Sequence, residues 1–356
     1  MSSRAKFLTA LLSCALAVVI AGCATTVPIA RNVPGSLAVE DFSVLRAVPV
    51  DAALEERILA LDPNRISEKD VATLAAGPTP RIMLLHGGIY PVHLVMESFG
   101  EFLVGMGYPE AKIRDRATGD WSRTPYDTSQ RLAGMVAWYY ERDGMRPMLI
   151  GHSQGGLYVV RILKELAGQN ADAVPVWNPM TDMSESRTTI IDPLTGRERP
   201  VVGTSVSYAS VVGAGGWALV LPNQWTSFST LRKIPDNTDE FTGYFISVDL
   251  FALSFPGNPL DTRYEGQGGV DVRNVMLPAD YNHVMVPATR ELAQDAEVRN
   301  WINTYVPGDG RSPSALPEEA RKHVLWAADV WYSIKKHWCR ESQRLIRARR
   351  SALARN

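Results

Sequence analysis

Cysteine is scarce in this sequence: only Cys14, Cys23 and Cys339 occur among 356 residues. Three cysteines spread over this length give no framework of paired disulfides. A chain this long can bury a large core, and 46% of its residues are hydrophobic. The sequence therefore predicts a globular protein whose stability comes from core burial rather than from crosslinks.

Signals for metals, nucleotides and nucleic acids are also missing. The six histidines are scattered, with no His-Glu-x-x-His pair of the kind that holds zinc. The glycine-rich run at 213–216 lacks the spacing and the Lys-Ser/Thr ending of a phosphate-binding loop. A net charge of −1 provides no uniform basic field for nucleic acid. We therefore expect no metal, no other cofactor and no nucleic-acid partner.

The apolar run near the N-terminus is too short for a comfortable membrane span. It covers residues 7–21 and follows Arg4 and Lys6, which indicates a signal peptide at 1–22. Its end, Ile-Ala-Gly-Cys, resembles the bacterial lipobox, whose cysteine is lipidated. That resemblance implies an exported protein, anchored through Cys23 to a bacterial membrane and facing the periplasm or the cell surface, with residues 23–50 as a tether. A plain signal peptide cut nearby is the alternative.

Short apolar runs alternate with amphipathic stretches from residue 51 to about 310. The lead-in at 51–80 is mostly helical. Strands are predicted at 81–85, 148–150, 204–212, 243–248 and 272–277, and helices after Asp127 and at 154–167 and 288–306. This alternation predicts one α/β domain with a mostly parallel sheet flanked by helices. An insertion at about 170–203 has the pattern of a hairpin or a lid.

The last segment, residues 311–356, is predicted to be a basic helical tail. From Arg321 onward, ten Lys or Arg residues stand against only Asp329 and Glu341. Apolar residues recur among the basic ones, as in an amphipathic helix. Two arrangements fit this pattern: a helix lying on anionic lipid headgroups, or a helix packed on the domain with a solvated charged face.

A serine stands in a glycine-flanked turn between a predicted strand and a predicted helix. Gly151, Ser153 and Gly155 fit Gly-x-Ser-x-Gly, in which the sharp turn exposes the serine hydroxyl at the end of the strand. With its sequence Gly-His-Ser-Gln-Gly-Gly, this stretch resembles the α/β-hydrolase superfamily, and within it the lipases and esterases. The resemblance covers residues 80–306. It implies the α/β-hydrolase fold, Ser153 as nucleophile and the backbone N–H of Gln154 as an oxyanion-hole donor.

A second match lies about 65 residues upstream, where His-Gly-Gly at 86–88 follows a buried strand. In similar hydrolases this loop supplies the second oxyanion-hole N–H, which the resemblance assigns to Gly88. Ile89 is the fallback if the loop is one residue out of phase. We expect His86 to hold the turn rather than to react.

The α/β-hydrolases order their triad as serine, acid and histidine, so the base must follow Ser153. His283 lies between the last predicted strand and a helix, where that superfamily keeps its catalytic histidine. His323 and His337 are in the basic tail, where a solvated role is expected.

The acid is less well determined by the sequence. Asp249 directly follows a predicted strand and lies in an apolar stretch, as a buried carboxylate should. Asp261 and Asp271 are its rivals, and Asp239 is a more distant one.

These residues together predict a serine-dependent carboxylic ester hydrolase that works through an acyl-enzyme. The lipase-like turn, the anchor and the apolar insertion favour an ester with an acyl chain as substrate. Aromatic and aliphatic residues at 217–225 either line an acyl pocket or belong to the core. An acyltransferase or a peptidase of the same fold is the first alternative. A non-catalytic anchored binding protein is the second, and it would be expected to lack the serine or the histidine.

Overall fold

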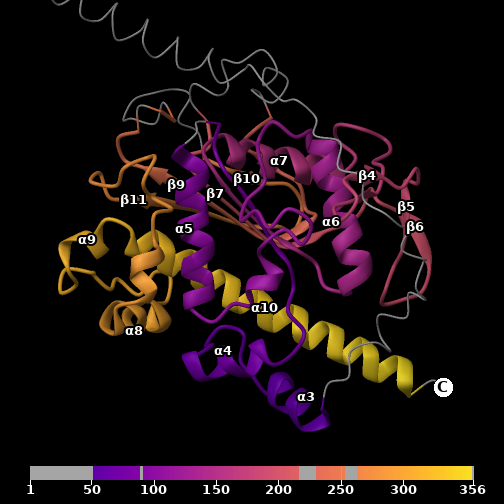
Figure 1. The fold of residues 1–356 in the computed structure, drawn as a ribbon, viewed down its shortest axis with the longest axis horizontal. Coiled ribbons are helices and arrows are strands. Elements are labelled where there is room, and N and C mark those ends of the chain that lie inside the picture. The colour runs from indigo at the N-terminus through magenta and orange to yellow at the C-terminus, as the bar shows by residue number, and fades with distance from the viewer. Residues whose placement is uncertain (1–50, 89–90, 216–229, 250, 253–262, 355–356) are drawn as a thin grey trace, which may run out of the picture.

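Five parallel strands form the central sheet of the protein in the computed structural model (Figure 1). The structure describes residues 51–88, 91–215, 230–249, 251–252 and 263–354. The strands, in spatial order, are β1 (Ile82–Leu85), β2 (Met148–His152), β7 (Val206–Val212), β9 (Thr238–Ile246) and β11 (Asp271–Leu277). The predicted parallel sheet within a mixed α/β fold is therefore confirmed. The predicted signal peptide and tether, with Cys23, lie outside the described residues.

Helices cover both faces of this sheet. Successive side chains of a strand point to opposite faces, so Ile82 and Leu84 enter one core while Met83 and Leu85 enter the other. One face carries α6 (Ser129–Asp143) and α7 (Gln154–Leu166). The other carries α5 (Pro91–Gly105) and α10 (Val324–Leu353), as Figure 1 shows. Burial on both sides explains why the central strands read as apolar runs rather than as alternating patterns.

The C-terminal tail is part of the domain core. Trp326, Trp331 and Trp338 of α10 are fully buried against the sheet and neighbouring helices. Several of its basic side chains pair with carboxylates of the protein, for example Lys336 with Glu240 at 2.7 Å. Of the two arrangements that the sequence allowed, the packed helix is the one observed. Among the described residues, none of the helices combines the length and apolar character of a membrane span.

The expectation that His337 is solvated is wrong, because its side chain is completely buried. Its ring stacks on Tyr208 of β7, and its Nε2 lies 3.2 Å from the Glu240 carboxylate of β9. The basic residues around it in the sequence suggested a solvent-facing helix. The helix instead turns this histidine toward the sheet.

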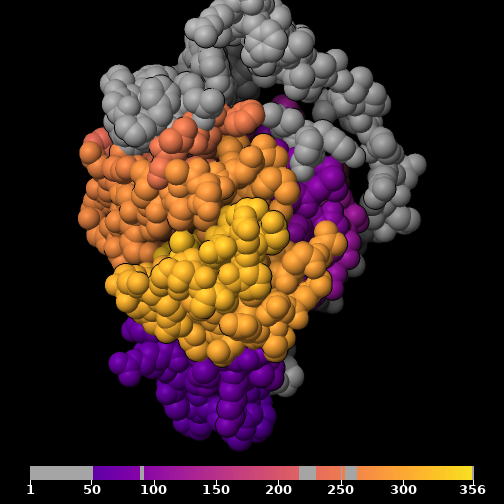
Figure 2. Space-filling view, turned by 90° about the vertical axis from the view of Figure 1, so that its left-hand side faces the viewer, coloured from indigo at the N-terminus to yellow at the C-terminus, as the bar shows by residue number. Residues whose placement is uncertain are grey.

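The lead-in forms α3 (Ala52–Leu59) and α4 (Glu68–Ala75), which pack against α10. Figure 2 shows this indigo segment directly below the yellow C-terminal helix. Gln343 of α10 donates to the carbonyls of Ile58 and Leu61 at 3.0 and 2.9 Å. The first described helices and α10 therefore stabilise each other on the side of the sheet that α10 covers.

The insertion at 170–203 forms two short hairpins beside α6. They are β3 (Trp177–Asn178) with β4 (Met183–Ser184), and β5 (Thr189–Ile191) with β6 (Glu198–Pro200). Arg187 joins them to α6 by an ion pair of 2.6 Å with the buried Glu141. A further small pair, β8 (Lys233–Ile234) with β10 (Glu265–Gly266), lies outside the main sheet.

Two helix termini differ from the sequence prediction, which gave one helix at 288–306 and, from Asp127 with Gln130 three residues later, Asp127 as the N-cap of α6. The helix expected at 288–306 is split into a 3₁₀ turn, η4 (Arg290–Ala293), and α8 (Ala296–Thr304), with Asp295 capping α8 through its side chain. The N-cap of α6 is Thr128, whose hydroxyl accepts from the backbone N–H of Arg131, whereas the Asp127 carboxylate pairs with the Arg131 guanidinium at 2.6 Å. Short helices η1 (Glu110–Lys112) and α9 (Glu318–Arg321) complete the described elements.

Candidate active site

Ser153 occupies a strained turn between β2 and α7. Its backbone has φ 55° and ψ −124°, a conformation that non-glycine residues seldom adopt. The turn is tight because a Cβ on Gly155 would lie against the carbonyl oxygen of Leu85 and 2.6 Å from that of His86. Only glycine fits there. The strand, the turn and the helix together place the Ser153 hydroxyl beyond the carboxyl end of the sheet, partly open to solvent.

His283 reaches this hydroxyl from the loop that follows β11. Its Nε2 lies 3.0 Å from Oγ of Ser153, although the two residues are 130 positions apart. The imidazole is largely buried, and its ring stacks on Phe251 at a centroid distance of 5.3 Å. Parallel strands end at the same edge of a sheet, which is why loops after β2 and β11 can meet.

Asp249, from the loop after β9, completes a hydrogen-bonded chain. Its Oδ2 lies 2.6 Å from Nδ1 of His283. Its Oδ1 accepts the backbone N–H groups of Phe251 and Ala252 at 3.0 and 2.9 Å. The carboxylate is buried, so these three donors stand in for the water it has lost.

The rival aspartates are placed differently. Asp271 is the first residue of β11, roughly 20 Å from the carboxyl end of that strand at about 3.3 Å per residue. Asp239 forms an ion pair with Arg146 at 2.7 Å. Asp261 lies outside the described residues. Among the described aspartates weighed from the sequence, Asp249 alone contacts His283.

The His-Gly-Gly loop is fixed by side-chain hydrogen bonds to two of its carbonyl groups. Nδ1 of His86 lies 2.7 Å from the carbonyl oxygen of Gly87, so this nitrogen carries the proton. Because the peptide is trans, the N–H of Gly88 points the opposite way from that carbonyl. The Tyr126 hydroxyl donates to the carbonyl of Gly88 at 2.8 Å. Burial lowers the pKa of His86, which keeps the ring neutral while it holds the turn as expected.

Gln154 is the first residue of α7, so its backbone N–H has no acceptor within its own helix. The side chain of this residue lies against Gly88: a Cβ on Gly88 would collide with Oε1 of Gln154. The two residues assigned to the oxyanion hole are therefore neighbours in space. The fallback residue, Ile89, lies outside the described residues.

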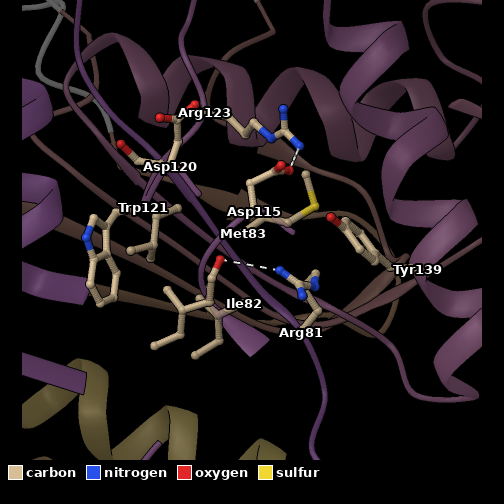
Figure 3. A pocket seen from close by; sticks show the side chains of 11 residues that line it. Arg81, Ile82, Met83, Asp115, Asp120, Trp121, Arg123 and Tyr139 are labelled. Carbon is tan, nitrogen blue, oxygen red and sulfur yellow. Dashed lines mark hydrogen bonds and ion pairs between the residues drawn. The ribbon is translucent and has the colours of Figure 1, made fainter. Parts of the chain in front are cut away.

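A short bridge beside β1 supports the same loop. Arg123 donates its N–H to Leu84 at 2.7 Å and accepts the N–H of His86 at 3.1 Å. Figure 3 shows the Arg123 guanidinium pointing at the Asp115 carboxylate, with which it forms an ion pair. The same view shows buried Arg81, whose guanidinium donates to carbonyls of the 111–114 segment. This support is not visible in the sequence, because the bridge has no strand pattern of its own.

A cavity of about 710 Å³ opens beside the His86–Gly88 loop, between α5 and the segment 114–131. Three arginines line it, and each has a carboxylate partner: Arg114 with Glu110, Arg123 with Asp115, and Arg131 with Asp127. Paired charges and aromatic side chains, among them Trp121 and Tyr126, therefore share the wall of the site on this side.

Three further residues at the site were missed by sequence reasoning. His152 contacts the backbone of His283, Phe251 stacks on its ring, and Gly213 lies beside it. His152 was visible within Gly-His-Ser-Gln-Gly-Gly, but the sequence does not show what its side chain faces. The described residues contain no group of three or more His, Cys, Asp or Glu side chains arranged to hold a metal ion.

Comparison with known proteins adds no relative. No family model matches the chain, and no curated protein matches it.

Proposed function

We propose that this protein is a serine hydrolase of the α/β-hydrolase type that cleaves carboxylic esters. The observation that carries the proposal is the continuous hydrogen-bonded chain from Asp249 through His283 to Ser153, at distances of 2.6 and 3.0 Å. This arrangement of nucleophile, base and orienting acid recurs on unrelated folds and is recognised by its geometry. The strained backbone of Ser153 supports the proposal, because such strain is concentrated at functional sites.

In the proposed first step, Oγ of Ser153 attacks the ester carbonyl carbon while its proton passes to Nε2 of His283. The Nδ1–H of His283 donates to Asp249, which holds the tautomer with a free Nε2 and stabilises the imidazolium. Collapse of the tetrahedral intermediate breaks the bond to the alkoxy group. His283 returns its proton to that leaving group, so an alcohol departs and an acyl-serine remains.

The negative charge on the carbonyl oxygen would be stabilised by the N–H groups of Gly88 and Gln154. Both belong to backbone that is already fixed, one by the hydrogen bond of His86 and the other by α7. Donors that need no reorganisation are usually the largest electrostatic contribution to acyl transfer, at about 3 kcal/mol for one donor.

In the second step, water attacks the acyl-serine with His283 as base, and the carboxylic acid leaves. An acyltransferase would admit another alcohol or an amine in place of water, and a peptidase would release an amine in the first step. We place ester hydrolysis first because Phe251 contacts the triad and other exposed apolar residues lie close to site residues in the sequence.

An exposed apolar side chain contacts the triad, because Phe251 stacks on the ring of His283. Many of the large exposed hydrophobic residues lie within a few positions of site residues: Leu94, Tyr126, Val248, Phe251 and Met285. Exposed apolar side chains in the loops that carry the triad suit an acyl chain. The cavity beside the His86–Gly88 loop, with its three paired arginines, suits the more polar part of an ester. The residues at 217–225, offered above as an acyl pocket, lie outside the described residues.

We further propose that the protein is exported and held on a bacterial membrane through Cys23. The sequence at residues 20–23 supports this proposal, together with the tether that follows. A non-catalytic binding protein is less well supported, because the serine, the histidine and a buried aspartate are all present and in contact.

The test is covalent labelling with a fluorophosphonate, together with turnover of p-nitrophenyl esters of increasing chain length. Wild-type protein should be labelled at Ser153, and Ser153→Ala should lose labelling and nearly all turnover. Ser210→Ala is a matched control, because Ser210 is a buried serine on the adjacent strand β7. Full turnover in Ser153→Ala would refute the proposal. Product analysis in the presence of an added alcohol distinguishes hydrolysis from acyl transfer.

A further inference from the structure

His152 is the last residue of β2 and directly precedes Ser153. Its side chain is completely buried beneath the triad. The proposed mechanism gives it no task, and a buried polar ring is costly unless its polar atoms are bonded.

One of the two ring nitrogens of His152 has a specific partner. Nε2 lies 2.7 Å from the main-chain carbonyl oxygen of His283. A carbonyl can only accept, so Nε2 carries the proton and donates it. Nδ1 has no hydrogen-bond partner in the described part of the chain. Burial lowers the pKa of His152 to about 3, with a smaller contribution from His283, so the ring is neutral near pH 7.

This contact joins the strand that carries the nucleophile to the loop that carries the base. The His283 side chain is held at Nδ1 by Asp249 and reaches Ser153 with Nε2. The loop is also fixed at Tyr281, two residues before His283, because the Tyr281 hydroxyl accepts the N–H of Leu325 in α10. Neither contact ties the backbone of His283 to β2. The hydrogen bond from His152 does.

We propose that His152 is a positioning residue that sets the distance between His283 and Ser153 through the backbone carbonyl of His283. The inference rests on the proposed hydrolase function. A leucine would fill much of the same space without burying an unpaired nitrogen, so packing alone does not explain a histidine here. The hydrogen bond to the catalytic loop does explain it.

The experiment compares three substitutions at this position. A glutamine side chain can place its amide nitrogen near the site of Nε2, whereas an asparagine reaches only as far as Nδ1, and a leucine has no donor. We expect His152→Gln to keep kcat within a few-fold of wild type. His152→Asn and His152→Leu should lose about 10- to 100-fold in kcat, because small misplacements of reacting groups have effects of that order. KM should change little in all three.

His337→Leu is the matched control, because His337 is an equally buried histidine in α10. It should lower the melting temperature without a selective loss of kcat at a temperature where the variant is folded. A loss of kcat in folded His152→Leu, restored in His152→Gln, supports positioning. Wild-type kcat in His152→Leu, or an equal loss in the glutamine and leucine variants, would overturn it.

A second readout does not depend on turnover. The Nδ1–H of His283, in its short hydrogen bond to Asp249, should give a strongly deshielded proton resonance. His152→Leu and His152→Asn should shift or broaden this resonance, and His152→Gln should retain it. An unchanged resonance in the leucine variant contradicts the inference. Absence of fluorophosphonate labelling in the wild type would instead refute the hydrolase proposal, so the two failures are distinguishable.

Discussion

Replacing Asp249 by asparagine tests the orienting acid without changing the size of the side chain. Oδ1 of Asp249 accepts the backbone N–H groups of Phe251 and Ala252, so the asparagine must keep its carbonyl oxygen on that side. Its NH₂ group then takes the place of Oδ2 and faces Nδ1 of His283, 2.6 Å away. Two donors cannot share this bond. The imidazole must therefore move its proton to Nε2.

A proton on Nε2 removes the acceptor that the Ser153 hydroxyl needs. The same substitution in a serine protease lowers turnover by about 10⁴-fold, and the geometry here gives the asparagine no alternative orientation. A factor of 10⁴ corresponds to about 5 kcal/mol of lost transition-state stabilisation. Folding should be affected much less, because the two backbone hydrogen bonds to the side chain are retained.

The assay is kcat for one soluble p-nitrophenyl ester, with thermal melting as a check on folding. Asp271→Asn is the control, because Asp271 lies at the opposite end of β11 from the His283 loop. We expect turnover to collapse in Asp249→Asn and to stay near wild type in Asp271→Asn. A normal rate in folded Asp249→Asn would refute the role of Asp249 and leave Ser153 and His283 untouched.

Three further substitutions test other parts of the structure. Gly213→Ala should lower kcat at least 10-fold, because the new Cβ would lie 2.8 Å from the ring of His283. The positive φ of 61° at this position adds about 1 kcal/mol of strain to the folded variant. A wild-type kcat would show that Gly213 does not confine the ring. Trp338→Ala should lower the free energy of unfolding by about 3–5 kcal/mol in denaturant titrations, because the side chain is fully buried. A change below about 1 kcal/mol would contradict the packing of α10. Cys23→Ser should release the protein into the soluble exported fraction, and continued sedimentation with membranes would refute the proposed anchor.

Local sequence patterns predicted a structural feature correctly where that feature depends on residues close together in the chain. The sharp turn at Ser153 needs glycine two positions after the serine, because a Cβ at Gly155 would meet the backbone of β1. Continuous apolar runs indicated strands buried on both faces, and chain order left His283 as the histidine between the last strand and a helix. The turn and the strands were inferred from residues a few positions apart, over which backbone geometry is fixed, whereas His283 was selected by the triad order of the α/β-hydrolases that the chain resembles.

The sequence favoured Asp249 as the acid but left Asp261 and Asp271 as rivals. Asp249 and His283 are 34 positions apart, and several aspartates follow or precede strands in this region. A sequence does not show which loop at the sheet edge turns inward. The register of β9 with β11 decides this, because it brings the ends of both strands level, with Ile246 opposite Leu277.

The C-terminal helix shows most clearly what sequence alone determined and what tertiary structure decided. Its periodicity established an amphipathic helix with basic residues, and it was equally consistent with a membrane surface and with the protein core. Amphipathicity identifies an apolar face but not the surface that covers it. In the fold, that face meets the sheet and α5, and buried Glu240 receives Lys336 and His337. The same reasoning applies to His152, because only the folded chain brings a backbone carbonyl 131 residues away to its ring.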